Sequence, residues 1–409
     1  MNTLPQITLR RLGADPLGRA LADVRAPHLP QSQMSDHYAL GNAALHRALQ
    51  AKIAHLVQVL APQLHSARLP WPGAQADVLA LDLAFVEHPR QPFELAWVEI
   101  QAFTSMLPTF HTLHCAQRAL HRLPSPWLPH DPLPPYADWV GFMRPWVAPH
   151  AATVLIEDRP RERFTWPDLD AARHWWGVAV HDWRELVPTF GRLFHPGTAR
   201  EYGHVWNRLI FSDLEAIERR QAEAVLMAAN RLSWHSHPAW YEGIHKGSLA
   251  DVALPAHEAC HWVEDRTRHD ADADPARWVA KAVGGHSGSG LLLAPTAEQL
   301  RALPTPRQWI VQNRFRQVPI GQHPDSGAPL FGEVRCMLGL RPGQPPWVMA
   351  WILRLSTNGI ATLSGRHTVP GEGMTLLYFD HGATAQCEVA HAGVVAASGM
   401  HEAPEAMYA

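Results

Sequence analysis

The chain has 409 residues, enough for two or three domains and a sizeable hydrophobic core. Apolar residues make up 46% and charged residues 18%, which is ordinary for a globular protein, and no apolar run is long enough to span a membrane. The formal net charge of −3 gives no sign of the strongly basic surface of a typical nucleic-acid-binding protein. We therefore expect neither a nucleic acid nor a membrane among its partners.

The cysteines and the N-terminus indicate a cellular compartment. Cys115, Cys260, Cys336 and Cys387 are far apart and form no C-x-x-C pair, which is typical of reduced thiols. Residues 1–30 contain no apolar segment of the kind a signal peptide needs. We therefore expect a cytoplasmic protein.

The first half of the chain alternates predicted helices and strands. Residues 1–35 are rich in proline and arginine and are expected to wrap the surface, whereas apolar spacing over residues 36–60 predicts a helix. The later elements are strands at 78–85 and 96–101, a helix at 105–121, a strand at 152–157, a helix at 168–176 and a strand at 178–180. The last three elements form a β-α-β unit, which indicates a parallel sheet.

Glu99 and Gln101 are unusual residues for the strand at 96–101, which has the composition of a buried strand. Burying their polar groups without partners is costly. Either other parts of the fold satisfy them, or they face a ligand cleft.

The second half is richer in predicted strands. Residues 202–211 and 213–231 fit a strand followed by a helix, or two helices. The later elements are two short strands within 278–293, a helix at 296–303 capped by Thr296, and strands at 309–315, 331–338, 347–355 and 373–379.

A glycine-rich loop joins the two short strands. Gly284, Gly285, Gly288 and Gly290 can adopt backbone angles that turn amide N–H groups toward a polyphosphate, and Lys281 precedes them. The loop matches neither the P-loop signature nor the dinucleotide fingerprint. A glycine-rich hairpin without a ligand is the alternative.

Lysine is scarce in this chain. Of the 35 lysines and arginines, only Lys52, Lys246 and Lys281 are lysines, so 35 − 3 = 32 are arginines. A site that needs a compact charge on a flexible stem would be among the last to lose lysine. This favours functional roles for Lys246 and Lys281, although three lysines can also be scattered by chance.

Several short motifs occur in a characteristic order. They are V-E-I-Q-A-F at residues 98–103, N-R-L-I-F at 207–211 and W-H-S-H-P-A-W at 234–240, followed by Lys246, the glycine loop and the strands around 309–315 and 331–338. Together they resemble the ATP-grasp superfamily, and a bacterial branch of it in particular. The resemblance covers roughly residues 95–365. It implies an α+β fold in which two subdomains hold ATP, preceded by an N-terminal α/β domain.

The resemblance also implies roles for individual residues. Lys246 and Lys281 would bind the nucleotide phosphates, and Gln312, Asn313, Arg314 and Phe315 would form the hinge at the adenine. The lid loop over the phosphates would be Gly285, His286, Ser287, Gly288, Ser289 and Gly290. Arg335 and Arg354, with Lys281, would act on the transferring phosphoryl group.

Magnesium is the second implied cofactor. Glu333 and Asn358 would be its ligands, because magnesium takes oxygen ligands that it shares with phosphates. The family usually has an acid two residues before such an asparagine, whereas Ser356 stands there in this sequence. The lid also lacks the lysine that related sequences often carry. These departures leave open whether the metal site is complete.

A competing motif is H-E-A-C-H at residues 257–261. On a helix, His257 and His261 would share one face and bind zinc, with Glu258 as general base. With 27 histidines in the chain, such a match also arises by chance. The ATP-grasp resemblance instead predicts a strand near the nucleotide at this point.

Two domains are therefore expected, an N-terminal α/β domain at 1–200 and an ATP-grasp domain at 201–395. The expected function is ATP-dependent ligation of a carboxylate to an amine or thiol through an acyl phosphate, with Glu99 and Gln101 lining the acceptor pocket. A catalytically silent ATP-binding protein and a zinc hydrolase at His257 and His261 are the alternatives.

Overall fold

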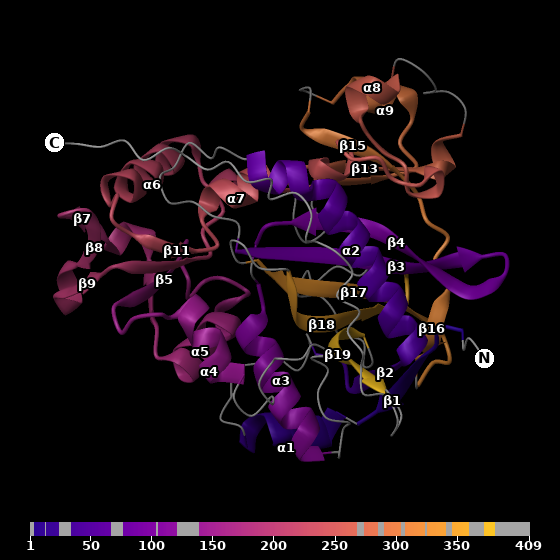
Figure 1. The fold of residues 1–409 in the computed structure, drawn as a ribbon, viewed down its shortest axis with the longest axis horizontal. Helices are drawn as coiled ribbons and strands as arrows, with labels where there is room; N and C mark the ends of the chain where they lie inside the picture. The colour runs from indigo at the N-terminus through magenta and orange to yellow at the C-terminus, as the bar shows by residue number, and fades with distance from the viewer. Residues whose placement is uncertain are drawn as a thin grey trace, which may run out of the picture.

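The computed structural model describes residues 4–12, 14–23, 34–66, 77–103, 105–120, 139–267, 274–284, 290–303, 307–323, 325–340, 346–359 and 372–380. Within them the chain forms one eight-stranded sheet, two four-stranded sheets and one three-stranded sheet, with helices packed around them (Figure 1). The α+β class expected from the sequence is confirmed. Cys115, Cys260 and Cys336 form no disulfide.

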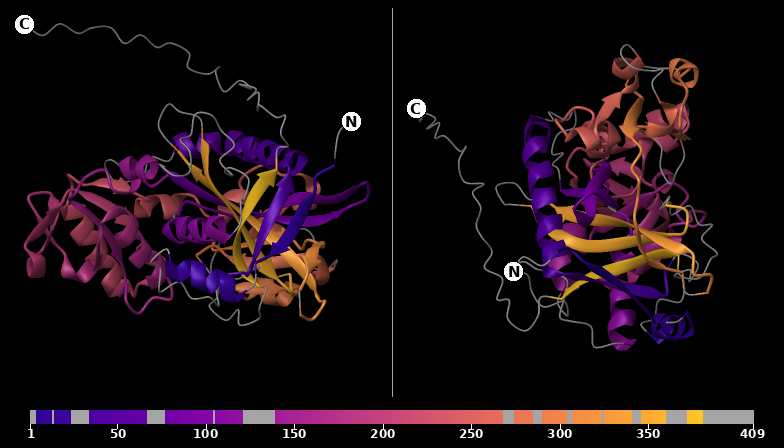
Figure 2. Two further views of the ribbon diagram at one scale, coloured as in Figure 1. Left: turned by 90° about the horizontal axis from the view of Figure 1, so that it is seen from below. Right: turned by 90° about the vertical axis from the view of Figure 1, so that its right-hand side faces the viewer.

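The eight-stranded sheet joins the two ends of the described chain. Its order is β1 (Ile7–Arg11), β2 (His37–Asn42), β19 (Gly373–Asp380), β18 (Trp347–Ser356), β17 (Pro329–Gly339), β3 (Val78–His88) and β4 (Gln91–Gln101), with β16 (Pro319–Gln322) beside β17. Neighbouring strands are antiparallel except for β2 and β19, which are parallel. Figure 2 shows the indigo and yellow strands of the two chain ends within this one sheet.

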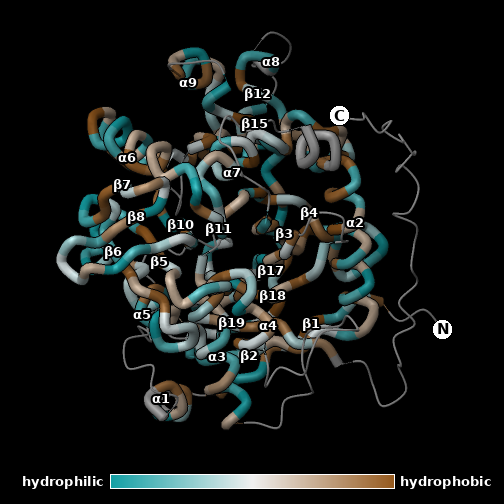
Figure 3. Tube along the Cα trace, turned by 60° about the vertical axis from the view of Figure 1, so that its left-hand side comes forward, coloured by the Kyte–Doolittle hydropathy of each residue, from teal (hydrophilic) through white to brown (hydrophobic). Residues whose placement is uncertain are grey.

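The central strands have one apolar face and one charged face, because side chains alternate along a strand. Leu81, Leu83 and Val334 point toward the long helix α2 (Ala43–Ser66) and belong to a buried hydrophobic cluster with it. In Figure 3 brown segments mark the apolar residues along these strands. The opposite face carries four buried charged residues at the same level, namely Asp82, Glu333, Arg335 and Arg354.

A four-stranded parallel sheet forms a second layer. Its order is β11 (Ser233–His235), β10 (His204–Asn207), β5 (Thr153–Glu157) and β6 (Ala179–Asp182). Helix α5 (Trp166–Trp176) connects β5 to β6, which confirms the predicted β-α-β unit, and α6 (Ala216–Ala228) connects β10 to β11. The small sheet of β7 (Val187–Thr189), β8 (Arg192–His195) and β9 (Arg200–Tyr202) is inserted between β6 and β10.

Helices from the first half of the chain pack on one another, on the large sheet and on α5 of the parallel sheet. They are α1 (Ala14–Asp23), α3 (Leu107–Leu120) and α4 (Trp139–Val147), while the short α7 (Pro238–Gly243) follows β11. Trp139, Trp176 and Trp206 are buried together in the hydrophobic cluster that these helices share with the large sheet. The tryptophans in this region are therefore core residues.

The second four-stranded sheet makes a small lobe at the upper right of Figure 1. Its antiparallel order is β12 (Cys260–Trp262), β15 (Trp309–Asn313), β13 (Trp278–Ala282) and β14 (Leu291–Leu293), with α8 (Val263–Thr267) and α9 (Ala297–Arg301) packed on it. Strands β13 and β14 flank the glycine loop, as predicted. Thr296 caps α9 in a reciprocal capping box with Gln299, also as predicted.

Two sequence-based expectations need correction. The helix expected over 36–60 begins only at Ala43, because residues 37–42 form β2, whose pairing with β1 and β19 overrides the helical spacing. The division into domains 1–200 and 201–395 does not describe the sheets. The eight-stranded sheet takes strands from both ranges, and β5 and β6 pair in one sheet with β10 and β11 across residue 200.

Candidate functional site

A cleft of about 970 Å³ lies where the two four-stranded sheets approach the charged face of the large sheet. Residues expected to act together from distant parts of the sequence line it: Glu99, Gln101, Lys246, Lys281, Gly290, Gln312, Asn313, Arg314, Phe315, Glu333, Arg335, Arg354 and Asn358. Gly285, His286, Ser287, Gly288 and Ser289 lie outside the described residues.

Lys281 is fixed by acceptors on the neighbouring sheet. Its ammonium group donates hydrogen bonds to the Val98 carbonyl at 2.8 Å and to Oε1 of Gln312 at 2.7 Å. Val98 is a bulge residue, because Asp82 of β3 pairs with Glu99 and Leu83 pairs with Trp97, so this carbonyl is displaced from the ladder. Burial lowers the pKa of Lys281 to about 8.

Gln312, which the sequence places in the hinge, holds the ammonium group of Lys281. It is buried in β15, where it pairs with Cys260 on one side and Val279 on the other. Its side-chain amide donates to the Trp97 carbonyl at 2.6 Å while its oxygen accepts from Lys281. The strands on both sides of β15 therefore use the backbone of Gln312.

Residues 314–318 connect the small lobe to the large sheet. The Arg314 amide donates to the Arg277 carbonyl at 2.7 Å, and the Val318 amide donates to the Phe85 carbonyl at 3.0 Å. Phe315 lines the cleft and packs against the small buried cluster formed by Ala84, Val86 and Ala96. The hinge expected from the sequence, residues 312–315, overlaps the start of this segment.

Lys246 brings a second ammonium group to the cleft. It begins a short 3-10 helix (Lys246–Leu249) that His245 caps, and its Nζ lies 3.8 Å from Oε1 of Glu99. Lys246 is close enough to Lys281 for its positive charge to contribute to the lowered pKa of Lys281. Lys52, the third lysine, pairs instead with the buried carboxylate of Glu258.

Asp82 organises the charged face, and sequence reasoning missed it. Its carboxylate accepts two hydrogen bonds from Arg335, both at 2.7 Å, and one from Arg354 at 2.6 Å. Burial alone would raise the pKa of Asp82, but the two guanidinium groups outweigh burial and hold it well below its usual range. Arg354 also pairs with Glu333. The two predicted catalytic arginines are therefore held by acids.

A carboxyl group with an altered pKa marks the other end of the cleft. Glu157 ends β5 and Arg208 follows β10, both at the carboxyl edge of the parallel sheet. At this point the chain leaving β5 runs to β6 on one side, and the chain leaving β10 runs to β11 on the other. Burial raises the pKa of Glu157 to about 7, against the opposing effects of Arg208 and Arg163. Arg208 is bound at 2.5 Å by Asp168, a buried residue that also accepts from the Met106 and Thr109 amides at the start of α3.

The H-E-x-x-H sequence does not form the helix that a zinc site of this type requires. Residues Ala256–Glu258 are a 3-10 turn, and Cys260–Trp262 are strand β12, as the ATP-grasp resemblance implied. His257 lies 3.3 Å from Glu94, and Glu258 is engaged by Lys52. Within the described ranges, neither His257 nor His261 belongs to a cluster of three potential metal ligands. The zinc hydrolase interpretation loses its structural basis.

Oxygen atoms of the kind that magnesium prefers face the cleft. They come from Glu99, Gln101, Glu333 and Asn358, which all line it beside the two lysines. Glu333 is already paired with Arg354, and the Asn358 oxygen accepts from the Ser356 hydroxyl at 2.5 Å. The donor set fits magnesium in kind, although a metal at Glu333 must share its carboxylate with Arg354.

In the part of the chain that the structure describes, no helix is long and apolar enough to cross a membrane. No protein-family model and no curated protein matches the sequence. A solved structure that is similar is the apo form of a glutathione synthetase-like effector from Globodera pallida. The TM-score is 0.52 at 11% sequence identity, covering 90% of this chain and 98% of the other. At this identity the likeness is one of fold, so the chain has a fold similar to that of a glutathione synthetase-like protein.

Proposed function

We propose that this protein is an ATP-grasp ligase, which uses ATP to activate a carboxylate and joins it to an amine or a thiol. The observation that carries the proposal is the single cleft shared by Lys246, Lys281, the end of the glycine loop and the segment after β15. These elements lie far apart in the sequence, and a core would not need to gather their charges at one solvent-accessible cavity. The fold similarity to a glutathione synthetase-like protein supports the same interpretation.

In this proposal the nucleotide lies between the small lobe and the large sheet. Lys246 and Lys281 neutralise phosphate oxygens, and the β13–β14 hairpin covers them. The adenine packs near Phe315, and backbone groups of residues 313–315 bind its edge. Gln312 acts indirectly by orienting the ammonium group of Lys281.

Magnesium would be held by Glu333 and Asn358. When bound, it would neutralise phosphate charge. Arg335 and Arg354 face the same space and would stabilise negative charge on the transferring phosphoryl group.

The proposed reaction has two steps, transfer of the γ-phosphoryl group to the carboxylate and then transfer of the acyl group to the nucleophile. An oxygen of the substrate carboxylate forms a bond to the γ-phosphorus as the bond to the leaving ADP breaks. The amine or thiol then attacks the acyl carbon, phosphate leaves, and the nucleophile loses its proton. Glu99 lies beside Lys246 and can take that proton or hold the ammonium form of the acceptor.

A second candidate is an ATP-binding protein without ligase activity. The observation that favours it is the closed network of Asp82, Arg335, Arg354 and Glu333. Arginines that are already neutralised have less capacity for a phosphoryl group, and an acid held by arginine is a weaker metal ligand.

ATP binding and ADP formation together test both candidates. Calorimetry with ATP and magnesium should show one nucleotide per chain, and a pool of amino acids, dicarboxylates and short peptides should stimulate ADP release. Glu99→Gln should leave ATP affinity within about twofold and abolish the stimulated release, because it removes charge and keeps shape. Glu87→Gln, on an exposed carboxylate at the far end of β3, is the control. ATP binding without stimulated ADP release by any pool would favour the silent protein, and absence of ATP binding would refute both.

A further inference from the structure

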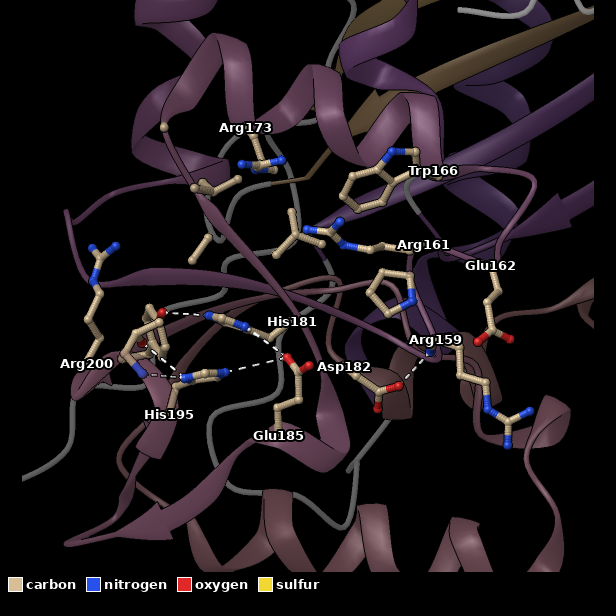
Figure 4. Close-up of a pocket in the computed structure, with 17 residues that line it drawn as sticks. Arg159, Arg161, Glu162, Trp166, Arg173, His181, Asp182, Glu185, His195 and Arg200 are labelled. Atoms are coloured by element: carbon tan, nitrogen blue, oxygen red, sulfur yellow. Dashed lines mark hydrogen bonds and ion pairs between the residues drawn. The ribbon is translucent and has the colours of Figure 1, made fainter. Parts of the chain in front are cut away.

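A second cavity, of about 730 Å³, lies on the other side of the connection between β5 and α5. Glu162 lines both this cavity and the cleft described above. At one wall His181, Glu185 and His195 converge (Figure 4). They come from β6, from the 3-10 helix after it (Trp183–Glu185) and from β8, so the insertion of the three-stranded sheet brings them together.

The three side chains have the spacing of metal ligands. Oε2 of Glu185 lies 3.1 Å from Nδ1 of His181 and 3.6 Å from Nε2 of His195, and one ligand atom from each of the three lies within 4.8 Å of the others. Tetrahedral zinc with bonds of about 2.0–2.1 Å separates its ligand atoms by roughly 3.3–3.4 Å. The two imidazole rings are stacked with centroids 4.0 Å apart, so their edges face the same carboxylate.

We propose that His181, Glu185 and His195 bind one divalent transition-metal ion, for which zinc is the reference probe. Two imidazoles and one carboxylate are a ligand set that zinc accepts, and they leave a coordination position open toward the cavity. Arg161, Arg173 and Arg200 line that cavity, with Arg161 stacked over Trp166 at 5.5 Å. A small anion on the open position would meet their guanidinium groups, whereas a purely structural zinc would have four protein ligands.

A metal ion can bind His181 and His195 once each imidazole ring moves its proton to the nitrogen that does not face the metal. Nε2 of His181 lies 2.9 Å from the Tyr202 hydroxyl, which can accept the ring proton once Nδ1 binds the ion. Nδ1 of His195 accepts from the Thr198 amide at 2.9 Å, so its proton is on Nε2 in the metal-free protein. Binding moves that proton to Nδ1, which then no longer accepts from the Thr198 amide and donates instead to the Thr198 hydroxyl, 3.1 Å away.

The acidic and arginine side chains around the cavity determine the charge that a bound metal ion would meet. The cavity is lined by three acids and four arginines, namely Glu162, Asp182 and Glu185, and Arg159, Arg161, Arg173 and Arg200. Asp182 is engaged by Arg184 at 2.9 Å, and Arg173 pairs with Asp170 at 3.0 Å. Glu185 has only histidines as ion-pair partners among the described residues, so its charge is available to a metal.

Zinc titration of the full-length, chelator-treated protein without nucleotide tests the proposal. The expected result is one zinc per chain at micromolar affinity or tighter, and a cobalt complex whose visible bands indicate four or five ligands. His181→Ala and Glu185→Gln should each weaken zinc binding at least tenfold. Because the chain has 27 histidines, the titration is run against a competing chelator so that weak surface sites do not contribute.

Two control variants separate this site from the other candidates. His257→Ala should leave zinc affinity unchanged, and Glu333→Gln should do so as well because it lies in the other cavity. Melting temperatures of the metal-free variants show that they fold. The proposal is overturned if the protein binds no stoichiometric zinc, if His181→Ala and Glu185→Gln bind it like the parent, or if only His257→Ala loses it.

Discussion

Lys281 shows how a single residue connects the small lobe to the large sheet. Its ammonium group is held by the bulged Val98 carbonyl and by Gln312. If it also binds a phosphate, Lys281→Ala should weaken ATP binding by at least about 1.5 kcal/mol, roughly tenfold, as expected for a lost charge-assisted hydrogen bond. Titration calorimetry measures the affinity. Arg301→Ala removes an exposed positive charge from the same lobe and should not change it.

The lowered pKa of Lys281 makes a pH-dependent prediction. Burial brings this pKa from 10.5 to about 8, so about half of the side chains are neutral at pH 8 in the free protein. A bound phosphate favours the ammonium form, so ATP binding near pH 8 should take up roughly half a proton, and affinity should fall as pH rises above 8. Calorimetry in buffers of different ionisation enthalpy measures this uptake. No uptake at pH 8, or the same uptake in Lys281→Ala, would contradict the assignment.

The raised pKa of Glu157 predicts how the stability of the fold depends on pH. Its folded pKa of about 7 lies above its ordinary value of 4.5, so the native state binds more protons than the unfolded state between these values. Stability should therefore fall as pH rises from about 4.5 to about 7, by up to about 3 kcal/mol from this group. Glu157→Gln should remove that part of the slope in urea unfolding, whereas Glu162→Gln, exposed on the following loop, should keep it. Equal slopes in all three proteins would show that Glu157 does not titrate this way.

The site residues that the sequence indicates are those whose type is unusual for its context. Lysines are scarce in this chain, and Glu99 stands in an apolar strand, so both are conspicuous among their neighbours in the sequence. Asp82 and Glu157 also lie in strands, but a lone acid has no sequence signal that distinguishes a buried partner from a solvated one. Their importance depends on which strands become neighbours, since Asp82 meets Arg335 only because β3 pairs with β17.

At the level of elements, the β13–β14 hairpin depends on Gly290. This residue has φ +66°, and a Cβ placed there would lie 2.5 Å from the Cβ of Ala282. Gly290→Ala should therefore distort the end of the hairpin and weaken ATP binding in calorimetry. Gly327→Ala is a matched control, because Gly327 has φ +68° but no atom within 4 Å of such a Cβ.

Both substitutions carry the left-handed backbone penalty of about 1–2 kcal/mol, so the difference between them isolates the steric contact. Gly290→Ala should be at least about 1 kcal/mol less stable than Gly327→Ala in urea unfolding. Indistinguishable stabilities and affinities would mean that the hairpin can rearrange around the added methyl group.

Elements with strong local signals can be predicted from the sequence, whereas elements defined by pairing cannot. The strands β3, β4, β17, β18 and β19 have long apolar runs, and α9 has its capping box, so both types are visible in the sequence. From the sequence, strand β2 is predicted as the start of a helix. Its six residues of alternating burial are too few to outweigh the helical pattern that follows in the sequence. The bulge at Val98 has no sequence signal, because it depends on the register with β3.

At the scale of the whole molecule, the large sheet joins parts of the chain that a division at residue 200 would separate. Strand β3 pairs with β17 from beyond residue 300, and β2 pairs in parallel with β19. Local periodicity contains no information about such distant pairs. The parallel sheet differs, because its four strands all lie between residues 153 and 235 and share a hydrophobic cluster of their own.

This topology predicts how pieces of the chain behave. Fragments 1–200 and 201–395 should each fail to fold alone, because each lacks strands that flank its part of the large sheet and would expose an apolar, unpaired edge. Fragment 139–244 contains all of the parallel sheet and its cluster, and should retain cooperative structure. Circular dichroism and thermal unfolding measure both outcomes, and co-expression of 1–200 with 201–395 should restore a cooperative transition near that of the intact chain. If 1–200 and 201–395 each unfold cooperatively on their own, pairing between β3 and β17 is not required for folding and the two ranges are autonomous domains after all.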